Sequence, residues 1–205
     1  MVQEITSAEL TKELISLDAR SNAQVIERVQ QLLERYPHRQ VAEALLALPR
    51  QSLANLLVRL DNRTVADLLS ELEPAEGASL LLRLTQARAA DVLEEMDPDD
   101  ATDLVQSVEV IDKRLAADLL LEVQPVEADE IRGLLAYPEH YAGGIMTTRV
   151  ATVSPEQTID QALIAIRSLA AERRTELVYY LYVVDADRRL VGVVALRDLV
   201  LAPPG

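Results

Sequence analysis

The 205-residue sequence contains no cysteine, no tryptophan and no phenylalanine, and only two histidines. Without cysteine the chain has no disulfide, no thiolate metal ligand and no cysteine nucleophile. The two histidines, His38 and His140, are too few for a histidine-rich zinc site. Because large aromatic side chains are scarce, leucine, alanine and valine must fill the interior, as in tightly stacked helices.

Long apolar runs are also missing. No stretch approaches the ~18 consecutive apolar residues of a membrane span, and the N-terminus has no signal-peptide pattern, so we expect a cytoplasmic location. Residues 1–136 carry 26 acidic and 13 basic side chains, whereas residues 137–205 carry 8 and 7. This negative first part argues against nucleic acid or an anionic membrane as a ligand, and favours cations or a basic partner.

Apolar residues recur every twelve positions through the middle of the chain. One column is Leu48, Leu60, Leu72, Leu84, Met96 and Val108. Two more columns are Leu57, Leu69, Leu81, Leu93 and Val105, and Ala54, Ala66, Ala78 and Ala90, closed by Thr102. Twelve residues make about three helical turns, so each unit is predicted to be one short helix and a turn. Such helices bury their apolar faces only by stacking, which predicts an all-helical superhelix.

Helix-starting residues occur at a fixed phase of this repeat. They are Pro37, Pro49, Asp61, Thr85 and Asp97. Aspartate and threonine accept hydrogen bonds from first-turn amides, and proline is tolerated there. Residues 1–36 are also predicted to be helical. After residue 109 the step lengthens to fifteen residues, and Pro125 is expected to start a last helix that runs to about Ala136.

The residue composition changes at Tyr137, after which β-branched residues become frequent. We predict, in order, a strand, a helix, two strands and a short helix at Val150–Val153, Thr158–Ala171, Val178–Val184, Leu190–Ala195 and Leu196–Leu201. A turn at Asp185-Ala186-Asp187 predicts that the last two strands form a hairpin. The predicted fold class is therefore α+β: an all-α superhelix at residues 1–136 and a β-α-β-β-α motif at 137–205.

Six acidic residues fall within ten positions: Glu94, Glu95, Asp97, Asp99, Asp100 and Asp103. A helix N-terminus favours negative charge, which accounts for the acids from 97 to 100. Asp103 lies one turn after Asp99, and like charges at that spacing destabilise a helix by about 0.2–0.5 kcal/mol. Asp103 also repeats the phase of Asp67 and Asp91, so stacked units are expected to align these carboxylates along one edge. A solvated acidic edge and a cation site both remain open from the residues alone.

Five segments closely resemble the MgtE-type magnesium transporter family. They are Met96-Asp97-Pro98-Asp99-Asp100, Tyr137-Pro138-Glu139, Ala142-Gly143-Gly144-Ile145-Met146-Thr147, Tyr179-Tyr180-Leu181-Tyr182-Val183-Val184-Asp185 and Gly192-Val193-Val194-Ala195-Leu196-Arg197-Asp198-Leu199. Residues 1–136 are similar to that family's N domain, and residues 137–205 to its first CBS motif. One departure is His140-Tyr141, where the family more often has an acid and a small hydroxyl residue.

The resemblance implies a regulatory Mg²⁺-sensing domain at the cytosolic face of the inner membrane, with Asp67, Asp99 and Asp103 as metal-binding residues. Weak binding through water suits Mg²⁺, which loses its hydration shell reluctantly. The partners implied are divalent cations and, in a full-length transporter, a second CBS motif and a membrane pore. The sequence has neither of these parts, so we expect it to be a fragment or a free-standing relative that does not transport by itself.

Two other functions remain alternatives. CBS pairs often bind adenine nucleotides such as ATP, and Asp198 matches a ribose-binding aspartate, although Ala195 stands at the position of the family's hydroxyl residue. Two copies of the chain could rebuild a CBS pair as a homodimer. The third hypothesis is a helical-repeat adaptor that binds a basic protein. No nucleophile–base set is visible, so we expect no enzyme.

Overall fold

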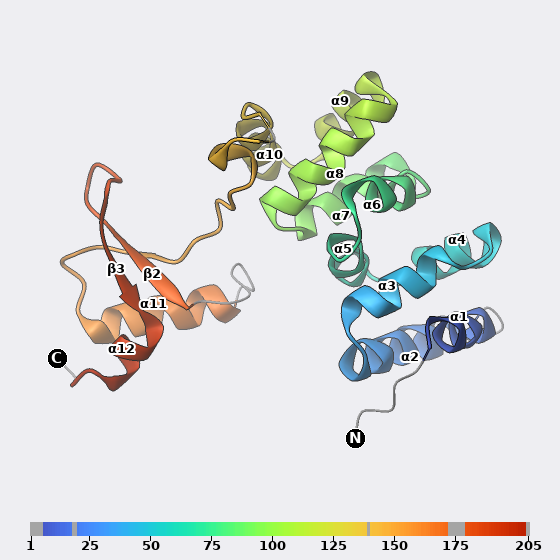
Figure 1. The fold of residues 1–205 in the computed structure, drawn as a ribbon, viewed down its shortest axis with the longest axis horizontal. Coiled ribbons are helices and arrows are strands. Elements are labelled where there is room, and N and C mark those ends of the chain that lie inside the picture. Colours follow the sequence, from blue (N-terminus) through green and yellow to red (C-terminus); the bar gives the residue numbers. More distant parts are fainter. Residues whose placement is uncertain (1–5, 18–19, 139, 172–178, 204–205) are drawn as a thin grey trace. The chain divides into compact units, whose positions relative to one another are not determined.

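The computed structural model describes residues 6–17, 20–138, 140–171 and 179–203. The chain forms two compact units, Met1–Met146 and Thr147–Gly205. The first is built of helices and the second contains a three-stranded sheet (Figure 1). This confirms the predicted α+β class. Within the described residues, no helix combines the length and the apolar character needed to cross a bilayer.

The helices of the first unit follow the predicted repeat. They are α1 (Ser7–Ser16), α2 (Asn22–Arg35), α3 (His38–Leu46), α4 (Arg50–Arg59), α5 (Asn62–Ser70), α6 (Pro74–Leu81), α7 (Gln86–Glu95), α8 (Pro98–Ile111), α9 (Lys113–Glu122), α10 (Pro125–Leu135) and the 3-10 turn η2 (Ala142–Gly144). From α3 to α8 each helix begins twelve residues after the previous one, and α9 begins fifteen residues after α8. Residues 1–5 and 18–19 of the predicted N-terminal helical segment lie outside the described residues.

Capping side chains explain several of these starts. The Asp61 carboxylate accepts a hydrogen bond from the Thr64 N–H at 2.9 Å, and Asp112 accepts from Arg114 N–H at 2.9 Å. Asp97 also occupies an N-cap position, but its side chain accepts no capping hydrogen bond there. The sequence thus predicted the position of Asp97 at the helix start correctly, but the predicted capping hydrogen bond of its side chain is not formed.

Alternate helices stack on one another. α1, α3, α5, α7 and α9 contact in succession, as do α6, α8 and α10 (Figure 1). Consecutive helices therefore fall in different rows, and residues 24 apart share a row. The predicted apolar columns face the core between them, with Leu57, Leu69, Leu81 and Leu93 at most 1% exposed.

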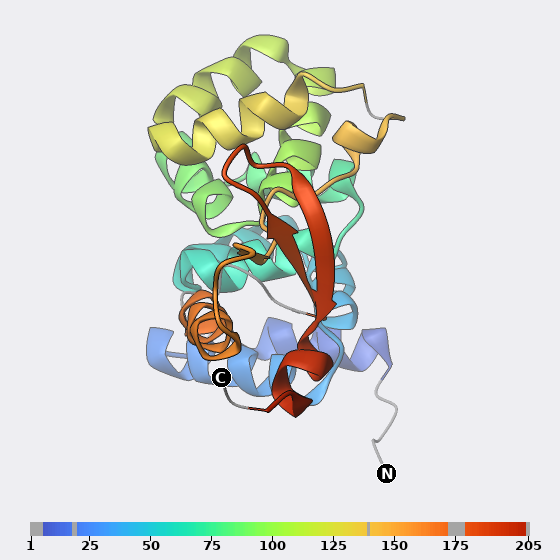
Figure 2. The same cartoon turned by 90° about the vertical axis from the view of Figure 1, so that its left-hand side faces the viewer.

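The second unit has the predicted element order. Its elements are β1 (Thr152–Val153), α11 (Ile159–Ala171), β2 (Tyr180–Val184), β3 (Leu190–Ala195) and α12 (Leu196–Leu201). β1 pairs with β2 in parallel, and β2 with β3 as the predicted antiparallel hairpin, which α12 follows directly (Figure 2). The first strand is shorter than predicted because only two residues pair with β2. Val178, assigned to the second strand from sequence, lies outside the described residues.

The sheet of the second unit is covered on one face and open on the other. Leu181 and Val153 pack with Ala162 and Ile166 of α11. Tyr180 and Val193 lie on the opposite face, because side chains alternate along a strand, and both are more than half exposed. Among the described residues of this unit, none covers this apolar sheet face.

Candidate metal site

The N-terminal part of α8 concentrates negative charge. Asp99 and Asp100 lie in its first turn, where the helix dipole stabilises anions, and Asp103 lies one turn further. All three side chains are half-buried. Four carboxylates from residues 97 to 103 therefore influence one another in partly desolvated surroundings.

A pocket of about 400 Å³ opens beside this helix. Its lining residues are Pro74, Asp99, Asp103, Gln106, Ser107, Val110, Gly144 and Ile145. α8 contributes most of them, α6 contributes its first residue, and the segment at η2 forms another wall. All lie within the first compact unit. The structure thus places two of the three predicted metal-binding residues, Asp99 and Asp103, in one pocket.

The carboxylate of Asp99 has one oxygen without a hydrogen-bond partner among the described residues. Its Oδ1 is inaccessible to solvent and accepts no hydrogen bond from any described residue. Within the described part of the chain, no cationic side chain forms an ion pair with Asp99 either. Burying a carboxylate oxygen without a partner costs free energy, so positive charge near Asp99 would stabilise this carboxylate through space.

The pKa of the Asp100 carboxyl is raised by burial and by the same crowding of carboxylates. Burial raises the pKa of its carboxyl, a hydrogen bond with the Ser70 side chain opposes that rise, and Asp99, Asp97 and Asp103 raise it further. These causes show that the carboxylates of this turn repel one another.

The raised pKa of Asp100 predicts a pH dependence of stability. A carboxyl whose pKa is higher in the folded state stabilises the fold below the unfolded-state pKa of about 4, and this contribution is lost as pH rises through the folded-state value. Asp100→Asn is therefore expected to raise the free energy of unfolding at pH 7 but not at pH 3.5. Urea unfolding at both pH values, with the exposed Asp187→Asn as the control, measures this. An equal effect of Asp100→Asn at both values would contradict it.

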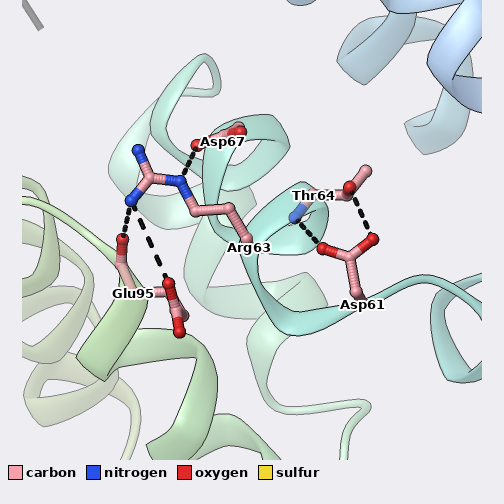
Figure 3. Close-up of polar contacts among 5 residues, drawn as sticks. All are labelled: Asp61, Arg63, Thr64, Asp67 and Glu95. Carbon is pink, nitrogen blue, oxygen red and sulfur yellow. Dashed lines mark hydrogen bonds and ion pairs between the residues drawn. The ribbon is translucent and has the colours of Figure 1, made fainter. Parts of the chain in front are cut away.

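Asp67 is held in a different environment. Its Oδ1 lies 3.1 Å from Nε of Arg63, one turn earlier on α5. Arg63 also donates to the Glu95 carbonyl at 3.1 Å and lies 4.0 Å from the Glu95 carboxylate (Figure 3). Asp67 does not line the pocket of Asp99 and Asp103. Its predicted metal role therefore stays a prediction, with Arg63 as a competing cation.

The expected alignment of Asp67, Asp91 and Asp103 along one edge is also wrong. Asp67 and Asp91 belong to α5 and α7 of one row, whereas Asp103 belongs to α8 of the other. The reason is that consecutive twelve-residue units alternate between rows. Asp91 instead accepts a hydrogen bond from the Asn62 amide at 3.4 Å.

Gly143 allows the η2 wall of the pocket to form. A Cβ at this position would lie within 3.0 Å of three atoms of the Tyr137 ring. Tyr137 follows the end of α10, so this close approach holds η2 against the end of the superhelix. The glycine is needed for space, since its backbone has no positive φ.

Gly143→Ala is expected to lower the free energy of unfolding by about 1–3 kcal/mol, the usual cost of overpacking. Urea unfolding measures it. Gly133→Ala is the matched control: nothing lies within 4 Å of a Cβ there, and alanine in a helix interior should stabilise by about 0.5–1 kcal/mol. Adding Tyr137→Ala to Gly143→Ala should restore most of the loss, and failure to do so would refute the steric explanation.

Sequence reasoning missed several lining residues. Gln106 and Ser107 follow Asp99 by seven and eight residues. Residues at this spacing lie on the same face of a helix, so the sequence alone would have allowed us to predict both beside Asp99. Gly144 and Ile145 had no such signal, because they reach the pocket through tertiary packing.

Comparison with known proteins identifies the chain. Residues 36–140 match the model of the MgtE intracellular N domain, and residues 142–205 match that of the CBS domain. The chain belongs to the MgtE family. This confirms the resemblance inferred from the sequence.

Related MgtE proteins extend this finding. The chain is 43% identical over 75 residues to a magnesium transporter MgtE of Enterococcus faecalis, covering 37% of this chain and 16% of that protein. It is 36% identical over 102 residues to MgtE of Thermus thermophilus, covering 50% of this chain and 22% of that protein. The matched regions thus span about a fifth of these MgtE relatives.

Two solved structures match the fold. The crystal structure of the soluble part of a magnesium transporter has a TM-score of 0.83 and 29% identity, covering 97% of this chain and 75% of that one. The cytosolic domain of the Mg²⁺ channel MgtE in complex with ATP has a TM-score of 0.64 and 33% identity, covering 85% and 75%. In this chain the match to the N domain is followed directly by the match to the CBS domain.

Asp198, the predicted nucleotide-binding residue of the MgtE CBS motif, is exposed in the first turn of α12. Ala195 occupies the N-cap of this helix and offers no side-chain hydrogen bond. Asp198 is in the second unit, so it forms no part of the pocket of the first unit.

Proposed function

We propose that this chain is the regulatory Mg²⁺-sensing region of a MgtE-type transporter. One observation carries the proposal: the two carboxylates of Asp99 and Asp103, one helical turn apart, line a single pocket. Carboxylate oxygens are the ligands that Mg²⁺ prefers, and this ion is commonly held by one or two of them with water completing its shell.

The residues fit such an ion by their chemistry. Asp99 and Asp103 would hold it and balance its charge, while Asp67 is a secondary candidate whose carboxylate already faces Arg63. Within the described residues, no three acidic or histidine side chains gather as a metal-binding group. Two carboxylates leave the remaining coordination positions to water, which matches weak, reversible binding.

One wall of the pocket lies close in sequence to the boundary between the two units. Gly144 and Ile145 form one wall, and the boundary between the units follows Met146. An ion that joins α8 to this wall would favour conformations in which the connecting segment is held. Binding that favours one conformation over others shifts their populations, and this is the regulation we propose.

Thermal unfolding against MgCl₂ from zero to about 20 mM tests the proposal. For a dissociation constant of about 1 mM, 20 mM Mg²⁺ should stabilise the first unit by roughly 1.8 kcal/mol. Ionic strength is held constant with NaCl because salt alone screens carboxylate repulsion. A saturable rise in melting temperature supports a site. No rise, or a rise that NaCl reproduces, would contradict it and favour an acidic surface that binds a basic protein.

The proposed regulation also requires other parts of a transporter, namely a second CBS motif and a membrane pore. The MgtE relatives are magnesium transporters, and we propose that this region works at the cytosolic face of the membrane with a second CBS motif and a pore. Co-expression with the membrane part of such a relative, followed by Mg²⁺-dependent transport measurements, tests this. Transport that keeps the same Mg²⁺ dependence without this region would contradict it.

We also propose that the second unit dimerises. Its open sheet face carries Tyr180 and Val193, which are 57% and 52% exposed, and a second CBS motif would cover them. Sedimentation equilibrium should reveal a dimer that Val193→Asp disrupts. A monomer at high concentration would contradict this proposal.

ATP binding is the second candidate function. It is supported by the MgtE cytosolic domain solved with ATP and by the exposed Asp198 at the start of α12. Calorimetric titration with ATP should give binding that persists in Asp99→Asn and is lost in Asp198→Ala. Binding insensitive to Asp198→Ala would place the nucleotide elsewhere.

A further inference from the structure

The guanidinium of Arg63 lies between two carboxylates that belong to different helices. Its Nε is 3.1 Å from Oδ1 of Asp67, one turn later on α5. Its Nη1 lies 4.0 Å from a carboxylate oxygen of Glu95, the last residue of α7. Figure 3 shows the guanidinium between the two acids. Two acidic side chains from helices that contact each other thus share one positive charge.

The same guanidinium also binds the backbone at the end of α7. Its Nη1–H donates to the Glu95 carbonyl at 3.1 Å. The last carbonyls of a helix have no partner within the helix, and positive charge near them is favourable because of the helix dipole. Arg63 is therefore held by the backbone as well as by the two acids. Rotation of its side chain away from Asp67 would break this hydrogen bond too.

Partial burial distinguishes this ion pair from an ordinary surface pair. The side chains of Arg63 and Asp67 are 27% and 30% exposed. Those of Arg114 and Asp118, an arginine and an aspartate at the same spacing on α9, are 90% and 49% exposed and lie 3.8 Å apart. Partly buried charges are screened less by salt than exposed ones. The attraction between Arg63 and Asp67 therefore persists when ions are added to the solution.

An arginine in this position competes with dissolved cations for the two acids. Its guanidinium stays charged at any physiological pH, and it is tethered one turn from Asp67. A group on a short tether acts at an effective concentration of roughly millimolar, which equals that of the Mg²⁺ it competes with. A guanidinium is also weakly hydrated, whereas Mg²⁺ loses its water reluctantly. Both comparisons favour Arg63 over Mg²⁺ at these carboxylates.

We propose that Arg63 is an autoinhibitory internal cation, which occupies the carboxylates of Asp67 and Glu95 in place of a divalent ion. Asp67 then binds no metal ion while its contact with Arg63 is intact. The three residues do not line the pocket of Asp99 and Asp103, so the inference does not depend on Mg²⁺ binding in that pocket. It narrows the proposed function by removing the secondary candidate from the metal-binding residues.

Broadening of amide signals by Mn²⁺ tests this in a chain that carries Asp99→Asn/Asp103→Asn, because this background removes the carboxylates of the pocket. With Arg63 intact, we expect no broadening centred on Asp67 and Glu95. Adding Arg63→Gln should produce broadening there that excess Mg²⁺ reverses. Removing one positive charge about 5 Å from a divalent ion in water raises the affinity for the ion roughly tenfold. A further Asp67→Asn should abolish the new broadening.

Two further variants in the same background serve as controls. Arg63→Lys keeps the positive charge and should exclude Mn²⁺ as arginine does, which separates the effect of charge from that of side-chain shape. Arg114→Gln removes an arginine that also precedes an aspartate by one turn. It should produce no broadening at Asp118, because a single exposed carboxylate is left there.

Two results would overturn the inference. One is broadening centred on Asp67 while Arg63 is intact, a result that requires no Arg63 variant to fold. The other is an Arg63→Gln variant that is folded by circular dichroism and shows no broadening at Asp67. The proposed function is tested separately by the Mg²⁺ response of the wild-type chain. Absence of that response would overturn the proposed function and leave this inference standing.

Discussion

Replacing Asp99 and Asp103 together by asparagine is expected to abolish the saturable stabilisation by Mg²⁺. Both carboxylates line the same pocket, and asparagine keeps their size while removing the negative charge that attracts the ion. Without Mg²⁺ the variant should be more stable than wild type by about 0.2–0.5 kcal/mol, because a like-charged pair one turn apart is removed. Thermal unfolding with and without 20 mM MgCl₂ measures both effects.

A second acid pair with the same spacing provides the control. Asp91 and Glu95 are exposed on α7 and lie outside the pocket, so Asp91→Asn/Glu95→Gln removes the same charge elsewhere. This variant should retain the Mg²⁺ response. If both double variants lose it to the same extent, general screening of an acidic surface explains the response and the site does not exist.

Leu81→Ala is expected to lower the free energy of unfolding of the first unit by about 2–5 kcal/mol. Leu81 is fully buried on α6, and α6 packs on α8. Truncation removes the transfer free energy of the side chain and leaves a cavity in the stack. Because neighbouring helices share one core, the loss should affect the cooperative unfolding of the whole superhelix.

Urea unfolding followed by circular dichroism measures this loss. Leu121→Ala is the control, since Leu121 on α9 is 77% exposed and a surface substitution should change stability by about 0.5 kcal/mol or less. Equal effects of the two variants would contradict the assignment of the twelve-residue apolar columns to the core.

The regular part of the fold was accessible from sequence because its signal is local and repeated. A period of twelve residues with a helix-starting residue at fixed phase gave the starts of α3, α4, α5, α7 and α8, and the fifteen-residue step gave α9. The order of elements in the second unit followed from β-branched runs and one turn. The alternation of helices between two rows was missed, since the period alone does not say which neighbours stack.

The candidate site was accessible only in part. The like charges of Asp99 and Asp103, one turn apart, drew attention to this helix, and the resemblance to the MgtE family implied their metal-binding role. Arg63 stands one turn before Asp67, so their ion pair could have been read from the same spacing rule. The contributions of Gly144 and Ile145 depend on tertiary packing between α8 and a segment some forty residues later, for which the sequence carries no local signal.

Manganese paramagnetic broadening tests the central claim most directly, because it locates the ion. Mn²⁺ replaces Mg²⁺ at oxygen sites and broadens amide signals of nearby residues in the spectrum of this 22.7 kDa chain. The account predicts broadening centred on Asp99, Asp103 and Gly144 that excess Mg²⁺ reverses. Broadening spread evenly over the acidic surface, or centred elsewhere, would contradict it.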